Sequence, residues 1–283
     1  MHLADSNKLA LLDNAPLGKR THYSSVYKPD LLYPIPRSLK RDEIGVSYPL
    51  GFYGYDIWNA YELSWLNPKG KPVVACAEII IPCESENLIE HKSLKLYLNS
   101  LNNTQFQSDT AIQETITKDL SQVIDKPVIV NLNPATLITQ PQLGEFDGLC
   151  LDGLDITCDT YKHTPEYLHT VKNAAVIEEK LYSHLLKSDC LITGQPDWGS
   201  IQIAYRGYPI DREGLLKYII SYRNHLEFAE QCVERIYMDI QRTCQPQMLV
   251  VYARYTRRGG IDINPIRSST ILDRPINQRL FRQ

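Results

Sequence analysis

The feature that most constrains the fold of this 283-residue chain is an internal repeat. The sequences LKLYLNSLNNTQF (residues 94–106) and LKYIISYRNHLEF (residues 216–228) align without gaps and share Leu, Lys, Asn and Phe. β-Rich runs flank both copies, namely KPVVACAEIII and PVIVNL around the first and GSIQIAYRG and MLVVYARY around the second. A repeated order of strand, helix, helix and strand indicates two similar units in one chain.

The second copy shows the helical periodicity in detail. Its two apolar stripes are formed by Leu215, Leu216, Ile219 and Ile220, and by Phe228, Cys232, Val233, Ile236, Tyr237 and Ile240. Asp211 is placed to cap the first helix, and Pro246 marks the end of the second. The Gly-, Pro-, Thr- and Asp-rich segment from about residue 134 to 172 is the predicted connection between the copies. We therefore predict an α+β fold with domains at residues 1–170 and 171–283.

Composition argues against several classes of protein. Of its residues, 22% are charged, and the formal net charge is -3. The chain therefore lacks the strong positive charge that would indicate nucleic-acid binding. The N-terminal sequence is too polar for a signal peptide, and no run approaches the ~18 apolar residues of a membrane span. The seven cysteines are odd in number and not closely paired, so we expect a cytoplasmic protein whose thiols are reduced and mostly buried.

Common cofactor and metal motifs are missing from the sequence. There is no C-x2-C pair and no H-E-x-x-H, so we expect no metal site. There is also no G-x-G-x-x-G and no Walker A loop. Any nucleotide cofactor must therefore bind in another way.

The segment KSDCLITGQPDWGS (residues 187–200) places a lone thiol, Cys190, shortly before a lone carboxylate, Asp197. Gly194 and Pro196 lie between them and allow the chain to turn. A thiol needs help to ionise at neutral pH, and a neighbouring carboxylate can take its proton and later return it. The pair suits addition to a polar multiple bond, whereas the plain structural alternative is a small buried core cysteine.

Four motifs occur along the chain, namely IEHKSLKLY (residues 89–97), CLITGQPD (190–197), EFAEQC (227–232) and YTRRGG (255–260). Together they resemble the NADPH-dependent nitrile reductases that convert 7-cyano-7-deazaguanine to its 7-aminomethyl form in queuosine biosynthesis. The similarity extends from about residue 36 to the end of the chain. It implies two tandem tunnelling-fold copies, each an antiparallel sheet with a helix pair on one face. It also implies NADPH as cofactor and a homodimer formed through sheet edges.

The resemblance also implies roles for individual residues. Cys190 would attack the nitrile carbon to form a covalent thioimide, and Asp197 would serve as proton donor. Two hydrides from successive NADPH molecules would then complete the reduction. The implied substrate-binding residues are Leu88, Ile89, Glu90 and Glu230, and the implied cofactor-binding residues are Lys92, Arg258 and Gly259. The plain alternatives are a first-turn helix acid for Glu230 and an exposed turn for the Arg-Arg-Gly-Gly stretch.

Two positions depart from the family pattern, since the family has histidine in place of Ala229 and serine in place of His91. Alanine can neither close over a substrate nor move a proton, so we predict that the thioimide forms but that turnover to amine is slower. His91 or His225 could supply the missing imidazole. The alternative for His225 is a residue at a helix C-terminus.

Two other functions fit the same residues. A nitrilase-like cysteine hydrolase would resolve the thioimide with water and release ammonia without consuming NADPH. A purine- or pterin-binding module would keep the pocket without turnover, and Ala229 favours this alternative. The zinc ligands of the related GTP cyclohydrolase fold are not visible in the sequence. We expect the reductase.

Overall fold

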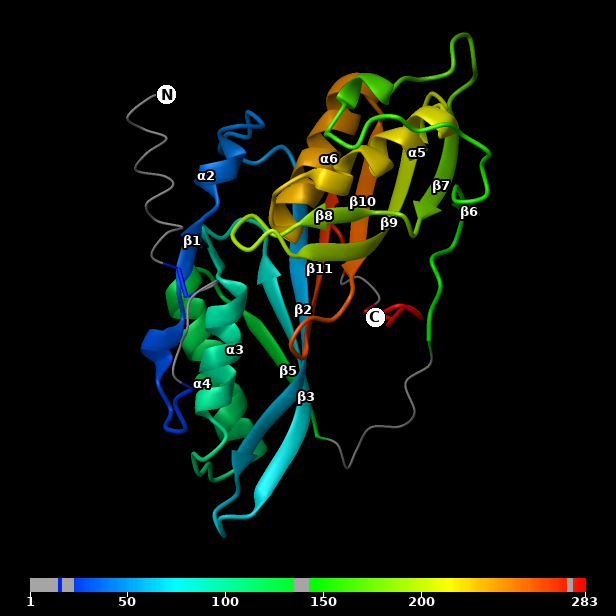
Figure 1. Cartoon of the computed structure of the whole chain (residues 1–283). Helices are drawn as coiled ribbons and strands as arrows, with labels where there is room; N and C mark the ends of the chain where they lie inside the picture. Colours follow the sequence, from blue (N-terminus) through cyan, green and yellow to red (C-terminus); the bar gives the residue numbers. More distant parts are fainter. Residues whose placement is uncertain (1–14, 17–22, 135–142, 274–276) are drawn as a thin grey trace. The chain divides into compact units, whose positions relative to one another are not determined.

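The computed structural model describes residues 15–16, 23–134, 143–273 and 277–283 (Figure 1). The chain folds into two compact units, and the strand β2 (Tyr53–Leu66) contributes to both. Unit 1 comprises Met1–Gly45, Ile57–Pro141 and Arg258–Ile261, and unit 2 comprises Val46–Asp56, Gln142–Arg257 and Asp262–Gln283.

Unit 1 is built around β2, which is followed in the hydrogen-bonded order by β3 (Pro72–Pro82) and β5 (Ile129–Pro134). β3 and β5 are antiparallel, with Ile80 opposite Ile129. The helices α3 (His91–Ser100) and α4 (Asp109–Ile124) lie beside each other next to these strands (Figure 1). The smaller elements are η1 (Pro29–Leu31), β1 (Pro34–Pro36), α2 (Ser38–Arg41) and β4 (Asn87–Ile89), and β1 pairs antiparallel with β4.

Unit 2 has a larger sheet, whose strands run in the order β11 (Ile261–Ser268), β10 (Met248–Tyr255), β9 (Pro196–Gly207), β7 (Ile177–Ser183) and β6 (Leu149–Cys150). The short strand β8 (Lys187–Asp189) also pairs with β9. The pairs β11–β10, β10–β9 and β9–β7 are antiparallel, and β6–β7 is parallel. The helices are η2 (Pro165–Tyr167), α5 (Arg212–Ser221), η3 (Tyr222–Asn224) and α6 (Ala229–Cys244). The predicted α+β class with a mainly antiparallel sheet is thus confirmed.

The helices of unit 2 follow the predicted periodicity. Cys232, Val233, Ile236 and Ile240 are fully buried, so the predicted apolar stripe is the face of α6 that packs on the sheet. The carboxylate of Asp211 accepts a hydrogen bond of 2.7 Å from the backbone N–H of Gly214, which confirms the predicted N-cap. α6 ends at Cys244, just before Pro246.

The predicted connection at about residues 134–172 contains more structure than its composition indicates, although residues 135–142 lie outside the described part. β6 pairs with β7, and the carboxylate of Asp152 accepts hydrogen bonds from the Ser183 hydroxyl (2.6 Å) and the His184 N–H (3.0 Å). The seven cysteines are free thiols, of which four are buried and Cys150 is exposed. Among the described residues, no helix is both long and apolar enough to cross a membrane.

A buried guanidinium fastens α6 to the strands of unit 2. Arg267 on β11 has no exposed surface and donates to Glu234 of α6 at 2.8 and 3.1 Å. It also lies 2.8 Å from Asp56 and donates to the Tyr55 carbonyl at 3.2 Å, both on β2. The ring of Phe52 lies 5.9 Å from the same guanidinium. One cation therefore joins a helix and two strands.

We expect Arg267→Met to destabilise the protein strongly, because it leaves two buried carboxylates without their shared cation. Breaking a buried ion pair in this way costs roughly 3–5 kcal/mol. Arg212→Met is the matched control, since Arg212 pairs with Glu179 but is 49% exposed, and its loss should cost at most about 1 kcal/mol. Urea unfolding measures both, and equal losses would contradict the assignment.

Candidate active site

The thiol and the carboxylate predicted to act together lie on one hairpin of unit 2. Ser188 of β8 pairs with Asp197 of β9, and the hairpin closes where the Cys190 N–H donates to the Gln195 carbonyl at 2.8 Å. Gly194 has a positive φ of 63° and donates back to the Cys190 carbonyl at 2.9 Å. Cys190 and Asp197 are thus diagonal neighbours on one face of the hairpin. The Cα atoms of such neighbours are roughly 7–8 Å apart, and their Cβ atoms are somewhat closer.

The thiol of this pair is buried, whereas Gly194, Gln195 and Pro196 at the tip of the hairpin are exposed. Cys190 is 4% exposed, and Asp197 is half-buried. Tyr255 on β10 is buried beside them. Burial, followed by the charges of Cys232 and Asp197, raises the pKa of the Tyr255 phenol well above its usual value.

The start of α6 is attached to the same hairpin. Residues 225–227 run alongside the end of β8, where the Asp189 N–H donates to the His225 carbonyl (2.8 Å) and the Glu227 N–H donates to the Asp189 carbonyl (3.0 Å). Ala229 and Glu230, which open α6, are both buried. The structure therefore brings the predicted residues Cys190, Asp197 and Glu230 into one part of unit 2. Glu230 also has the first-turn position that its structural alternative describes.

The other predicted residues belong to unit 1, where Leu88 and Ile89 are buried on β4. Glu90 follows them, fully buried, and is the N-cap of α3. Its two carboxylate oxygens accept from the backbone N–H groups of Lys92 (2.8 Å) and Ser93 (2.7 Å). The sequence did not indicate this capping role.

Arg258 and Gly259 lie in a tight turn between β10 and β11. The Arg258 N–H donates to the Ile261 carbonyl at 2.9 Å, and Gly259 and Gly260 have positive φ angles of 57° and 76°. Two successive residues of this kind form the type of hairpin turn that favours glycine. The turn described by the structural alternative is thus present, but Arg258 itself is half-buried rather than exposed.

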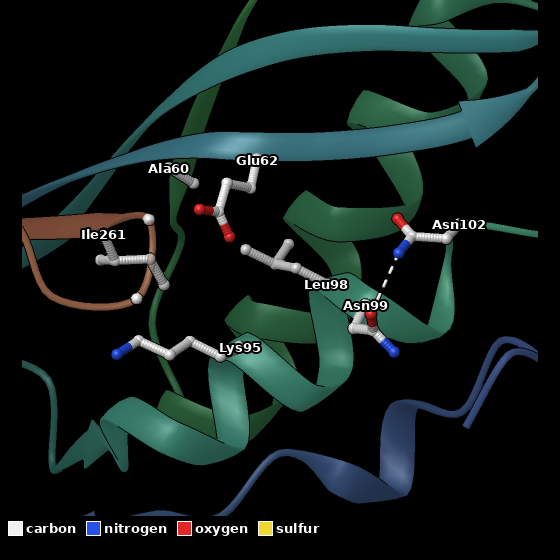
Figure 2. A pocket seen from close by; sticks show the side chains of 9 residues that line it. Ala60, Glu62, Lys95, Leu98, Asn99, Asn102 and Ile261 are labelled. Atoms are coloured by element: carbon white, nitrogen blue, oxygen red, sulfur yellow. Dashed lines mark hydrogen bonds between the residues drawn. The ribbon is translucent and has the colours of Figure 1, made fainter. Parts of the chain in front are cut away.

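This turn forms one wall of a cavity of about 190 Å³ (Figure 2). Lys95 from α3 and Glu62 from β2 extend toward it from opposite sides. A Cβ atom on Gly259 would lie 2.7 Å from Lys95 Nζ, and one on Gly260 would lie 2.4 Å from the Glu62 carboxyl carbon. Neither polar residue was predicted from the sequence. The available signal for Lys95 was its position one helical turn after Lys92, which places both on similar sides of α3.

The two histidines considered as substitutes for the missing family histidine have other contacts. The ring of His91 packs edge-on against Trp58, with centroids 5.0 Å apart. His225 forms a hydrogen bond of 2.9 Å from Nε2 to Glu227, and it also caps the short helix η3. Among the described residues, no group of three or more His, Cys, Asp or Glu side chains is arranged to hold a metal ion.

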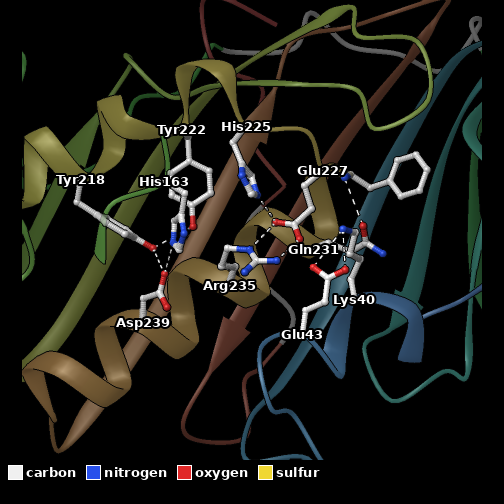
Figure 3. A network of polar contacts seen from close by, with 11 residues as sticks. Lys40, Glu43, His163, Tyr218, Tyr222, His225, Glu227, Gln231, Arg235 and Asp239 are labelled. Carbon is white, nitrogen blue, oxygen red and sulfur yellow. Dashed lines mark hydrogen bonds and ion pairs between the residues drawn. The ribbon is translucent and has the colours of Figure 1, made fainter. Parts of the chain in front are cut away.

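Figure 3 shows Glu227 with its polar contacts, and the pKa of this acid is lowered. It is 1% exposed, and burial alone would raise its pKa. Hydrogen bonds from Arg235 and His225 and their charges outweigh that effect and lower the pKa from 4.5 to about 2. Arg235 approaches with two nitrogens, at 2.7 and 2.9 Å from the two carboxylate oxygens.

Comparison with known proteins covers most of the chain. Residues 23–132 match the family model described as nitrile reductase, 7-cyano-7-deazaguanine-reductase N-term, and residues 196–272 match that of QueF-like proteins. A protein of Dechloromonas aromatica (strain RCB) named NADPH-dependent 7-cyano-7-deazaguanine reductase is 56% identical over 283 residues, which cover 100% of this chain and 98% of that protein.

Similar values hold for other proteins of the same name. The protein of Ralstonia nicotianae (strain ATCC BAA-1114 / GMI1000) is 55% identical over 96% of this chain and 99% of its own length. That of Legionella pneumophila (strain Lens) is 54% identical over 96% of both. The solved structure titled as the apo archaeosine synthase QueF-Like covers 36% of this chain, with 16% identity and a TM-score of 0.31, which is too low to bear on the fold.

The two family matches define the class, an α+β protein of the nitrile reductase type. More specifically, the chain belongs to the NADPH-dependent 7-cyano-7-deazaguanine reductase family.

We expect Glu227 to make the stability of the protein depend on pH in the acid range. Because its folded pKa of about 2 lies below the ordinary 4.5, the stabilisation is complete above pH 4.5 and is lost as the pH falls toward 2. The shift corresponds to on the order of 3 kcal/mol. Urea unfolding of the parent and Glu227→Gln proteins at several pH values should show a weaker acid dependence in the variant. Equal dependence would contradict the assignment.

Proposed function

We propose that this protein reduces the nitrile of 7-cyano-7-deazaguanine to the 7-aminomethyl group, with NADPH as the reductant. The names of relatives that match the chain over nearly its whole length support this substrate and cofactor. The observation that carries the proposal is the β8–β9 hairpin, whose register sets Cys190 diagonally across from Asp197. Backbone bonds between Cys190, Gly194 and Gln195 close the turn.

The first chemical step follows from these two groups. Asp197 takes the thiol proton, and the Cys190 sulfur forms a bond to the nitrile carbon. One π bond of the nitrile breaks, and its electron pair moves to nitrogen, which receives the proton from Asp197. The product is a neutral thioimide. Exclusion of water by the bound substrate would protect the thioimide from hydrolysis.

Buried acids fit recognition of the deazaguanine base. A carboxylate can accept two N–H bonds from the guanine-like edge, and Glu230 opens α6 beside the thiol hairpin. In unit 1, each oxygen of Glu90 accepts one backbone N–H and retains a further lone pair. Leu88 and Ile89 supply the adjoining apolar surface. We assign these four residues to substrate binding.

The turn at residues 258–261 fits the cofactor. Its wall is made by two glycines, where a Cβ would collide with Lys95 or Glu62, so the backbone remains accessible to a phosphate group. Lys92, Lys95 and Arg258 bring cations to the same unit, and cations suit phosphates. We assign Lys92, Arg258 and Gly259 to NADPH binding and add Lys95. When bound, NADPH supplies the hydride.

Several finer features belong to the same proposal. The order of strand, helix, helix and strand in each unit supports two tandem tunnelling-fold copies. Domains at residues 1–170 and 171–283, a homodimer and a cytoplasmic location stay predictions. So does slower turnover because of Ala229. This residue opens α6 directly before Glu230, where a histidine could reach a substrate held by that acid.

Anaerobic mixing with 7-cyano-7-deazaguanine in the absence of NADPH should raise the intact mass by one substrate molecule. Cys190→Ala should abolish this adduct, and Asp197→Asn should slow its formation roughly 10²–10⁴-fold. Cys244→Ala is the matched control, because both thiols are 4% exposed. Later addition of NADPH distinguishes the alternatives: its oxidation with amine formation supports the reductase, and ammonia release without oxidation indicates a hydrolase. Binding without any adduct indicates a binding module and contradicts the proposal.

We expect Ala229→His to accelerate NADPH oxidation, because the imidazole adds a group that can move protons. Such groups contribute roughly 10²–10⁴-fold, and a gain of at least about 10-fold is expected here. Thioimide formation should change little, since Cys190 and Asp197 are unaltered. Ala229→Asn controls for the added side-chain volume without a titratable group. An equal rate in the histidine and asparagine variants would show that Ala229 does not limit turnover.

A further inference from the structure

Unit 2 contains a buried polar cluster that the proposed chemistry does not use (Figure 3). Its centre is Glu227, which is bonded to Arg235 through both carboxylate oxygens and to His225 through Oε2. The side chains of Glu227, Arg235 and His225 are 1%, 12% and 20% exposed. A fully charged pair with so little solvent must be held in a fixed geometry to repay its desolvation.

A second group of side chains supports the imidazole of His225. Its ring packs against those of Tyr222 and His163, at centroid distances of 5.2 and 5.6 Å. His163 bonds to Asp239 at 2.6 Å, and Asp239 also accepts from the Tyr218 hydroxyl at 2.7 Å. These contacts limit the positions that the His225 ring can occupy.

The cluster is connected to the thiol through the backbone. Two of its members bond to the backbone of Asp189, the residue directly before Cys190: the His225 carbonyl accepts from the Asp189 N–H, and the Glu227 N–H donates to the Asp189 carbonyl. Lys187 reinforces this attachment by donating to the Asp189 carboxylate at 2.6 Å and to the Arg223 carbonyl at 2.5 Å. The end of β8 is therefore held on one side by β9 and on the other by residues 223–227.

The cluster is also connected to the first turn of α6. Arg235 lies on α6, between one and two turns after Glu230. Its two hydrogen bonds to the Glu227 carboxylate therefore fix how residues 225–227 approach that helix. Any movement of Glu227 would displace Asp189 on one side and the first turn of α6 on the other. The same contacts therefore set the separation between the nucleophilic sulfur and the base-binding acid.

We propose that Glu227, Arg235 and His225 are positioning residues for the reaction, which hold Cys190 and Glu230 at the spacing that thioimide formation needs. The inference rests on the proposed function. It assigns His225 to positioning rather than to proton transfer in place of the missing histidine, because its Nε2 is engaged with Glu227. The three residues act through Asp189 and α6 rather than on the reacting atoms.

The test measures the rate of thioimide formation without NADPH, by intact mass or adduct absorbance, together with the substrate Kd and the midpoint of urea unfolding. Glu227→Gln keeps the side-chain shape and removes the charge. We expect its adduct rate to fall roughly 10- to 100-fold, since a displacement near 1 Å has effects of this size. Glu179→Gln is the matched control, because Glu179 also bonds to an arginine and a tyrosine of unit 2, Arg212 and Tyr205, away from the hairpin.

Two further variants keep the test decisive if Glu227→Gln folds poorly. Arg235→Lys retains the ion pair and should recover part of the adduct rate that Arg235→Met loses. His225→Gln leaves the Glu227–Arg235 pair intact and should slow adduct formation severalfold while unfolding at nearly the parent midpoint.

The outcomes separate this inference from the function on which it rests. If the parent protein forms no adduct, the proposed function fails. If the parent forms it and Glu227→Gln forms it as fast as Glu179→Gln, the positioning role is wrong and the function stands. Equal rates for Arg235→Lys and Arg235→Met, or an unchanged rate for His225→Gln, would also overturn the positioning role.

Discussion

The buried guanidinium of Arg267 is the group on which the architecture of unit 2 most depends. A cation without solvent is tolerated only where its surroundings satisfy it, and here Glu234 of α6 and Asp56 of β2 do so. The helix α6 is therefore fixed to the strands by a directional contact as well as by its apolar stripe. Because α6 opens with Ala229 and Glu230 and carries Arg235, the position of this helix decides where the polar groups of the site lie.

The two copies use their helix starts differently. In the second copy, Asp211 caps α5 through a single bond to Gly214, which is a structural task. In the first copy, Glu90 caps α3 with both oxygens and is also assigned to the substrate. The two backbone N–H groups and the helix dipole hold the Glu90 carboxylate in place at the start of α3. The helix bounds place Glu90 and Asp211 at the same N-cap position, one residue out of register with the gapless alignment of residues 94–106 and 216–228, and the two copies use this position for different purposes.

Much of the candidate site could be predicted from local sequence. The turn residues Gly194, Gly259 and Gly260 have the backbone angles that only glycine adopts easily, and the Cys190 segment forms the expected turn toward Asp197. The capping role of Glu90 and the cluster around Glu227 were not predicted. The members of this cluster, such as Glu227, Arg235 and His163, belong to separate sequence patterns. Nothing in the local sequence distinguishes any of them from an ordinary polar residue. Lys95 and Glu62 could be recognised as cavity residues only from the tertiary structure, in which α3 and β2 both meet the turn at Gly259 and Gly260.

The sequence by itself determined the α+β class, the helical stripes, the Asp211 cap and membership of the family, because these depend on local periodicity and on residues close together in the chain. The tertiary structure alone decided which charges are buried together and how β6, β8 and residues 225–227 pair. Such contacts join segments distant in sequence, and their energy depends on burial and on hydrogen-bond geometry, which no local pattern encodes.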